Sequence, residues 1–207
     1  LGIDNYGIIQ SGGTRNWAPD GGHTSGRKWP ILFAGIILGD EGMKSIGGKS
    51  GSYLYTFNYP AYGPGNVPAG YIHFGEDGQT FYVTDEDVTR SHSVDWSPSD
   101  RSGTPAPFMP GDKGLAEWGI VHSTNPYVDN KDWLAIYRQC CTALAWQGFV
   151  LAARIMEDNA GAKTLWNHDA LFDYQDRYMA VTADSGSNPE WRSSVAGMDS
   201  IWGTYTG

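Results

Sequence analysis

Residues 132–157, DWLAIYRQCCTALAWQGFVLAARIME, form the strongest helical pattern in the chain. Asp132 has the side chain of a helix N-cap, and Ala, Leu, Cys and Met dominate the residues that follow it. The segment is apolar almost all round, which is typical of a helix that other helices surround. We therefore expect a buried helix here, at the centre of a mainly α-helical fold.

Two further segments predict helices that would pack around the first. Residues 29–38, WPILFAGIIL, are apolar on every side and carry Pro30 in the first turn, which favours a buried helix over the alternative of a buried strand. Residues 167–180, NHDALFDYQDRYMA, place apolar side chains on one stripe and acids elsewhere, as in an amphipathic outer helix. Joined as antiparallel hairpins, these helices predict a partial (α/α) toroid, with an ordinary helical bundle as the alternative.

Residues 45–131 differ from these segments in composition, because they are rich in Gly, Pro, Ser, Tyr and Asp. Within them GYIHF at 70–74 and QTFYVTD at 79–85 predict short strands. A structureless loop of this length is unusual inside a compact domain, so we expect an irregular insertion that packs as a lid or cleft wall. The whole chain, 1–207, is expected to be a single α-helical domain or a fragment of one, because it starts at Leu1 within a helix-like stretch.

Composition excludes some classes of function. Acidic residues number 23 against 14 basic ones, with no basic run, so nucleic acid is not an expected partner. No uninterrupted apolar run is long enough to predict a membrane span. Nine Trp, 12 Tyr and 28 Gly suit a cleft that stacks on sugar rings, although Trp also fills cores.

The adjacent Cys140 and Cys141 are expected to be two buried thiols, because a vicinal disulfide is rarer.

The turn GGHTSGRK at 21–28 predicts an anion-binding corner. Its leading glycines permit close approach of a ligand, and Arg27 and Lys28 precede a helix N-terminus, whose dipole favours anions. A uronic-acid carboxylate would be held by Arg27, and His23 would take or share a proton. The alternative is that His23 bonds a carbonyl and Arg27 pairs with an acid of the chain.

Helix direction adds an expectation about a second turn. If the three predicted helices run up, down and up, the first and third begin at the same end of the fold. Asn167, His168 and Asp169 would then face His23 and Arg27 across a cleft. Asn167 or Asp169 is equally explained as an N-cap.

The insertion and the residues after it supply a second candidate set: His73, Glu76, Asp77, Tyr82, Glu117, Trp118, His122, Tyr137 and Arg138. Acids, imidazoles and tyrosines are denser there than solubility demands, although solvation or core packing also explains each one singly. No HxH, HExxH or CxxC pair and no nucleotide-binding signature occurs. We therefore expect no metal site and no cofactor, with a structural divalent cation left open.

Four stretches carry a resemblance to a known class of protein: SGRKWPILFAGIILGD, FGEDGQTFYVTD, YRQCCTALAWQGFVLAARIM and LWNHDALFDYQDRYM. They resemble segments of secreted bacterial helical-toroid proteins akin to polysaccharide lyases of heparinase-like and alginate-lyase-like type. The resemblance implies a secreted or periplasmic protein with an (α/α) toroid. It also implies cleavage of uronic-acid glycans by β-elimination.

β-Elimination needs a carboxylate neutraliser, a base for the C5 proton and an acid for the leaving oxygen. The candidates are Arg27 or Asn167 as neutraliser, His23 or His168 as base, and Tyr82 or Tyr137 as acid. The catalytic prediction is therefore His23, Arg27, His168 and Tyr82, and the substrate-binding prediction is Asn167, Trp118, His122, Tyr137 and Arg138. The net charge of −9 opposes a polyanionic substrate unless the cleft itself is basic.

Two other functions fit the same sequence. An inverting glycoside hydrolase on an (α/α) toroid would use two of the carboxyls Glu76, Asp77, Glu117, Asp169 and Asp173. A non-catalytic carbohydrate-binding or surface-assembly module would stack sugar on Trp17, Trp96 and Trp118. The expected partners are an acidic polysaccharide or oligosaccharide and, because two helices are apolar on every side, the remainder of a longer chain or a second copy.

Overall fold

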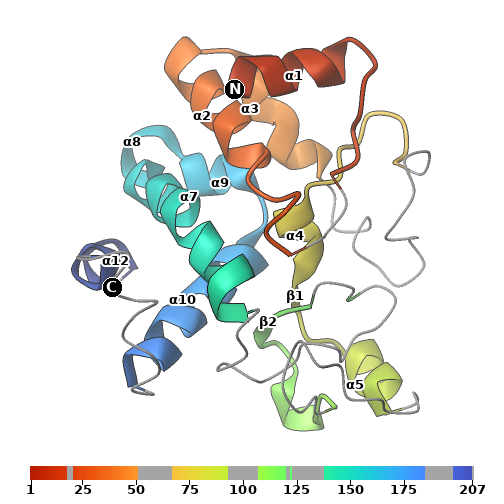
Figure 1. Cartoon of the computed structure of the whole chain (residues 1–207), viewed down its shortest axis with the longest axis vertical. Helices are drawn as coiled ribbons and strands as arrows, with labels where there is room; N and C mark the ends of the chain where they lie inside the picture. Colours follow the sequence, from red (N-terminus) through yellow and green to blue (C-terminus); the bar gives the residue numbers. More distant parts are fainter. Residues whose placement is uncertain are drawn as a thin grey trace.

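The computed structural model describes residues 1–17, 21–50, 67–92, 107–119, 122, 138–184 and 198–206. The fold is mainly helical, as the sequence predicts (Figure 1). Its elements are α1 (Gly2–Gln10), α2 (Lys28–Leu38), α3 (Glu41–Lys44), η1 (Ser45–Lys49), α4 (Gly75–Gln79), β1 (Thr80–Tyr82), α5 (Asp85–His92), η3 (Pro110–Asp112), β2 (Ala116–Trp118), η4 (Gln139–Ala143), α7 (Leu144–Ile155), α8 (Glu157–Ala160), α9 (Ala162–Trp166), α10 (Asp169–Asp184) and α12 (Met198–Thr206).

Helix α2 confirms the prediction of a helix over 29–38 but not its complete burial. Ile31 and Leu32 are fully buried, whereas Phe33, Ile37 and Leu38 are exposed by 44, 64 and 60%. The helix ends at Gly39, which adopts the left-handed conformation with φ 68°. One side of α2 therefore faces solvent in the described structure, and the expectation that a partner covers it stays a prediction.

The central segment is helical over its described part. Residues 139–143 form a π-helical turn that continues into α7, and the start expected at Asp132 lies outside the described residues. Trp146, Val150 and Ala153 bury the inner face of α7. Cys141 is disulfide-bonded, and the only other cysteine in the sequence is its neighbour Cys140. The expectation of free thiols is therefore wrong.

Helix α10 confirms the amphipathic helix expected over 167–180. Its apolar stripe is buried, with Leu171, Tyr174 and Tyr178 exposed by 3% or less. The preceding helix α9 ends at Asn167, which takes the left-handed conformation with φ 58°. Asn167 therefore ends one helix, and α10 starts two residues later.

The insertion over 45–131 contains helices as well as strands in its described part. Strands β1 and β2 pair antiparallel, with Thr80 opposite Trp118 and Tyr82 opposite Ala116. The strand expected at 70–74 is not formed as such. The structure has an isolated β-bridge there, between His73 and Asn16. Helices α4 and α5 flank β1, so the expectation of short strands alone was incomplete.

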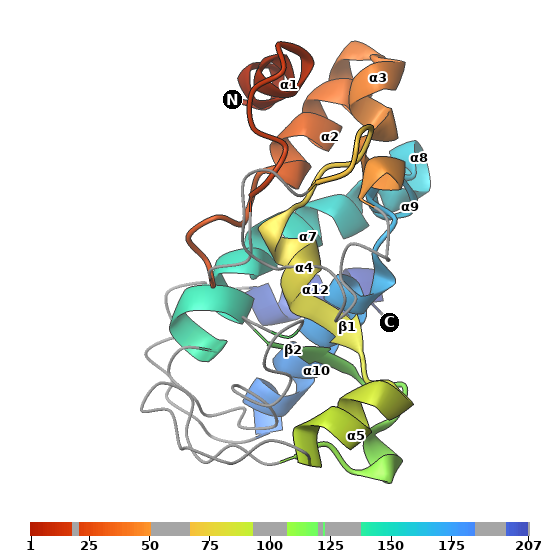
Figure 2. The same cartoon turned by 90° about the vertical axis from the view of Figure 1, so that its right-hand side faces the viewer.

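Aromatic side chains fill the main core, which α2, α7, α9 and α10 enclose. Trp118, Trp146 and Trp166 are exposed by 1% or less, so these indoles pack the interior. In both views α4 and β1 lie between α2 and α3 at one end and α5 at the other (Figures 1 and 2). No helix in the described part of the chain has the length and apolar character needed to cross a bilayer.

Replacing Gly47 by Ala tests the close packing of η1 on α9. A Cβ at Gly47 would lie 1.7 Å from the carbonyl oxygen of Leu165, so backbone must move. We expect Gly47→Ala to lower the free energy of unfolding by about 3 kcal/mol, measured by chemical denaturation.

Gly148→Ala is the matched control, because a Cβ on this exposed side of α7 meets nothing within 4 Å. Its expected effect is a gain of roughly 0.5–1 kcal/mol from helix propensity. Equal losses in the two variants would contradict the packing described here.

Candidate functional site

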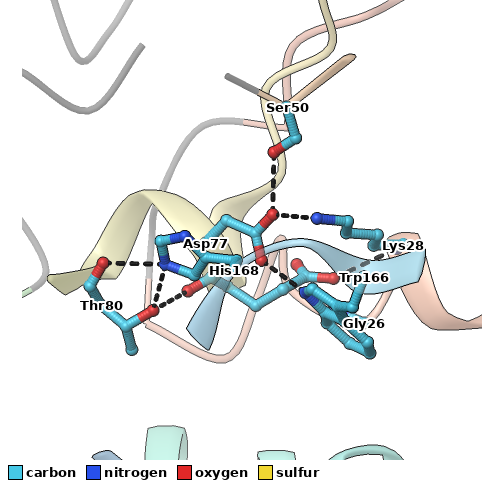
Figure 3. Close-up of polar contacts among 8 residues, drawn as sticks. Gly26, Lys28, Ser50, Asp77, Thr80, Trp166 and His168 are labelled. Carbon is cyan, nitrogen blue, oxygen red and sulfur yellow. Dashed lines mark hydrogen bonds and ion pairs between the residues drawn. The ribbon is translucent and has the colours of Figure 1, made fainter. Parts of the chain in front are cut away.

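A group of polar side chains lies inside the fold where α2, α4 and the end of α9 meet (Figure 3). We call it the Asp77 cluster, and its members are Lys28, Ser50, Glu76, Asp77, Thr80, Trp166 and His168. Lys28, Glu76 and Asp77 are 0% exposed. Buried charges are rare unless they are paired, so this cluster is the strongest candidate site in the described structure.

Asp77 is the centre of the cluster. Its Oδ2 accepts hydrogen bonds from Lys28 Nζ at 2.5 Å and from Ser50 Oγ at 2.8 Å. Its Oδ1 accepts one from Trp166 Nε1 at 2.8 Å. One carboxylate thus links α2, α9 and the residue that follows η1 to α4.

The Lys28 ammonium lies in an aromatic setting. Its Nζ is 5.6 Å from the centroid of the Phe74 ring and 5.5 Å from that of the Trp166 ring. Burial lowers the pKa of Lys28, although Asp77 opposes the shift. For Asp77, burial favours the neutral acid, but the charge and hydrogen bond of Lys28 outweigh it and leave the pKa lowered.

Glu76 occupies the anion corner that the sequence predicts at the start of α2. Its Oε2 accepts from the backbone N–H of Gly26 and its Oε1 from that of Lys28, both at 3.1 Å. The anion at this helix N-terminus is therefore supplied by the chain itself. Burial, with a further contribution from Asp77, raises the pKa of Glu76 to about 7.

Gln79, the last residue of α4, binds the glycine-rich turn that precedes α2. Its side-chain amide donates to the carbonyl oxygens of Gly21 at 2.9 Å and Gly75 at 2.8 Å. Glu76 and Gln79 lie three residues apart in α4, which puts them on neighbouring positions of one helix face. The FGEDGQT stretch thereby binds a turn about 50 residues earlier in the chain.

His168 connects the cluster to β1. Its Nε2 lies 2.9 Å from Thr80 Oγ1 and 3.0 Å from the Thr80 carbonyl oxygen (Figure 3). Because a carbonyl oxygen only accepts, Nε2 carries the proton of the neutral ring and Nδ1 is its basic nitrogen. Burial lowers the pKa of His168, with Asp77 opposing the shift and Lys28 adding to it, so the neutral ring predominates near pH 7.

Tyr82 lies two residues further along β1 and reaches the same helix as His168. Its hydroxyl donates to Asp173 Oδ2 at 2.5 Å, while the residue as a whole stays 39% exposed. Partial burial and the bond to Asp173 raise the pKa of Tyr82, so the phenol keeps its proton. We call this region, where the exposed Tyr82 and the half-buried His168 and Asp173 border the buried Thr80, the β1–α10 seam.

The turn before α2 and the turn between α9 and α10 lie close together, as the sequence predicts. Their contact is made by Trp29, Lys28 and Trp166, whereas the prediction named His23, Arg27 and Asn167. Trp29 stacks on Trp166 with ring centroids 6.2 Å apart, and Lys28 meets Trp166 through Asp77. His23 is exposed on the loop before α2, and Arg27 is half-buried at the N-cap of α2. Their assignment to catalysis stays a prediction.

The predicted binding residues of the insertion lie elsewhere. Trp118 is buried and donates from Nε1 to Gln79 Oε1 at 3.3 Å, so its ring is not exposed for stacking on sugar. His122 is 6% exposed, lies 2.5 Å from Asp87 through Nε2 and stacks on Phe81 with centroids 3.4 Å apart. Tyr137 lies outside the described residues.

Arg138 is fully buried beneath the small sheet. It donates to Glu117 Oε2 at 3.3 Å and lies 5.8 Å and 5.6 Å from the rings of Trp118 and Tyr174. Glu117 also accepts from Arg177 at 3.0 Å. One buried carboxylate thus binds a buried and a partly exposed guanidinium group, which matches the core-packing alternative left open for Glu117 and Arg138.

Metal binding has no support in the described part of the chain, where no three His, Cys, Asp or Glu side chains gather to hold an ion. No known protein family, curated protein or solved structure gives a significant match to this chain. The resemblance to helical-toroid lyases therefore stays a prediction that rests on the sequence alone.

Several members of the Asp77 cluster escaped the sequence analysis. Ser50, Thr80 and Trp166 were not singled out, and Lys28 was expected to contribute positive charge to a ligand site rather than to pair with Asp77. The available signal was the lysine immediately before an apolar helix together with the acidic pair in FGEDG. Neither pattern specifies its partner, because the two residues are 49 positions apart.

Replacing Lys28 by Met tests the buried pair. The substitution leaves the Asp77 carboxylate buried without its cation, so we expect a loss of about 3–5 kcal/mol in the free energy of unfolding. Adding Asp77→Asn should recover part of that loss, because the second change removes the uncompensated charge.

Lys113→Met is the control, since Lys113 pairs with Asp85 at 2.7 Å while its side chain is 48% exposed. It should cost less than about 1 kcal/mol in chemical denaturation. A double variant no more stable than Lys28→Met alone would contradict a direct interaction between the pair.

Proposed function

We propose that the protein is a polysaccharide lyase that cleaves uronic-acid-containing glycans by β-elimination at the β1–α10 seam. The observation that carries the proposal is the placement of a candidate base and a candidate acid on one surface. His168 contacts Thr80, and Tyr82 stands two residues along the same strand. Both residues adjoin the start of α10, because Tyr82 donates to Asp173 of that helix and His168 immediately precedes it.

The protonation states of the two side chains suit their proposed roles. Neutral His168 accepts the C5 proton on its ring, and the phenol of Tyr82, released from Asp173, donates its proton to the glycosidic oxygen as the C4–O bond breaks. Asp173 orients the phenol through the 2.5 Å bond. Asn167, exposed next to His168 in a left-handed conformation, is the proposed neutraliser of the substrate carboxylate.

Other parts of the proposal have their own support. The disulfide at Cys141 favours a secreted or periplasmic location. The packing of α7 against α9, α10 and α12 supports a partial (α/α) toroid. The exposed apolar side of α2, with Phe33 and Ile37, supports a covering partner, either the remainder of a longer chain or a second copy.

A glycoside hydrolase is the second candidate, and the acids of α10 favour it. Asp169 and Asp173 are four residues apart on the helix that borders the seam, and both raise the pKa of Tyr82. Two carboxylates beside the acid repel a polyanion and suit a neutral glycan. By contrast, Glu76, Asp77 and Glu117 are buried, which leaves Asp169 and Asp173 as the surface pair among the carboxyls considered.

A glycan panel separates the candidate functions. We expect alginate, glucuronan, pectate or a glycosaminoglycan to give an unsaturated uronyl product that absorbs in the ultraviolet. New reducing ends without that absorbance would contradict the lyase and favour the hydrolase. Binding without turnover would favour the non-catalytic module, and neither binding nor turnover on any glycan would contradict all three.

The seam itself is tested by Tyr82→Phe. Removing the phenol proton donor should lower kcat about 100-fold or more with little change in thermal stability. Tyr205→Phe is the matched control, because Tyr205 is 44% exposed on α12, and it should keep wild-type turnover. Full activity of Tyr82→Phe would place the reacting site elsewhere.

A further inference from the structure

Lys28 and Asp77 are more than a buried ion pair, because a third ionisable group adjoins them. The amine nitrogen and the carboxylate oxygen are 2.5 Å apart at 0% exposure of both side chains. Glu76 is equally buried and accepts from the backbone N–H of Lys28. The rings of Phe74 and Trp166 flank the amine.

We propose that Lys28 and Asp77 form an intramolecular isopeptide bond, an amide between Lys28 Nζ and Asp77 Cγ, with release of one water molecule. An amine held against a carboxyl group in an apolar, water-poor interior has the proximity that condensation needs. Hydrolysis of the product is disfavoured by the same exclusion of water.

The step balances without any co-reactant. One proton moves from the Lys28 ammonium to Asp77 Oδ2 along their contact, which gives a neutral amine and a neutral acid. Nζ then bonds to Cγ, and its second proton passes to the Oδ2 hydroxyl within the tetrahedral intermediate. The Cγ–Oδ2 bond breaks, water leaves, and the third proton stays on the amide nitrogen.

The other members of the Asp77 cluster are placed to assist. Trp166 Nε1 donates to Oδ1, where negative charge develops in the tetrahedral intermediate, at 2.8 Å. Ser50 Oγ donates to Oδ2, the oxygen that leaves, also at 2.8 Å. Burial lowers the pKa of Lys28, which favours release of its proton, whereas the neighbouring Lys28 keeps the pKa of Asp77 lowered. The neutral amine and acid are therefore a minor form of the pair, from which the bond is made.

A second lysine–aspartate pair, on the surface, is one in which the proposal predicts no isopeptide bond. Lys113 Nζ lies 2.7 Å from Asp85 Oδ1, a similar separation, but the side chains are 48 and 82% exposed. Water reaches both side chains there, so neither the desolvation that favours condensation nor the protection from hydrolysis is present. We therefore expect a bond at Lys28–Asp77 and none at Lys113–Asp85.

Intact-mass spectrometry of the reduced, denatured full chain tests the bond directly. The expected mass is about 18 Da below that calculated from the sequence, the loss of one water. After trypsin, peptide 28–44 should be found joined to peptide 50–90. A chain at its calculated mass, with peptides 29–44 and 50–90 found separately because trypsin cleaves after a free Lys28, would overturn the proposal.

Asp77 is followed by Gly78, and cyclisation of an Asp-Gly backbone to a succinimide also releases water. Lys28→Arg separates the two reactions, because guanidinium does not condense with Asp77. The isopeptide bond predicts the calculated mass for Lys28→Arg. A persistent loss of about 18 Da in that variant, without joined peptides, would assign the loss to the succinimide and overturn the proposal.

Two further variants test the chemistry. Asp77→Asn should condense with loss of ammonia, about 17 Da below its own calculated mass, because the leaving group changes. Ser50→Ala should form the bond at least about tenfold more slowly after refolding, since the hydrogen-bond donor to the leaving oxygen is absent. An unchanged rate in Ser50→Ala would remove Ser50 from the reaction, while the wild-type mass decides the bond itself.

Discussion

The burial of Lys28 opposite Asp77 is the constraint on which the rest of the structure depends. Removing two charges from water costs several kcal/mol for each ion, so the pair is tolerated only with close geometry and additional hydrogen bonds. Ser50 and Trp166 supply those bonds to Asp77. The requirement fixes α4 against α2 and α9, and β1 follows α4 without an intervening residue. The position of Tyr82 at the β1–α10 seam is therefore a consequence of the pairing of Lys28 with Asp77 in the interior, before and after the proposed bond forms.

The same constraint divides the acidic residues into two populations. Glu76, Asp77 and Glu117 are buried and satisfied by cations or backbone amides, so they organise the fold. Asp169 and Asp173 remain on the helix that borders the seam. The net charge of −9 is therefore a poor measure of the charge on a ligand-binding surface, because some of the acidic residues counted in it are buried.

Local patterns predicted the helices well and the charged interior poorly. The apolar runs at 29–38 and 167–180 and the described part of 132–157 became α2, α10 and α7, since periodicity and helix punctuation act over short distances. The anion corner at the start of α2 was also predicted, because amide groups at a helix N-terminus attract anions wherever they occur. Its occupant, Glu76, lies about 50 residues away, and pairing at that separation follows from tertiary packing alone. The aromatic load was ambiguous for the same reason, and Trp118, Trp146 and Trp166 proved to be core residues.

Hydrogen exchange at the start of α2 tests the central claim, that the charged interior holds this region in place. The amide of Gly26 lies just before α2 and that of Lys28 in its first turn, where intrahelical partners are lacking, and both donate to the buried Glu76 carboxylate. If the cluster organises the fold, these two amides should exchange nearly as slowly as those in the middle of α7, in line with global unfolding. Exchange as fast as that of exposed loop amides, while α7 stays protected, would contradict the account.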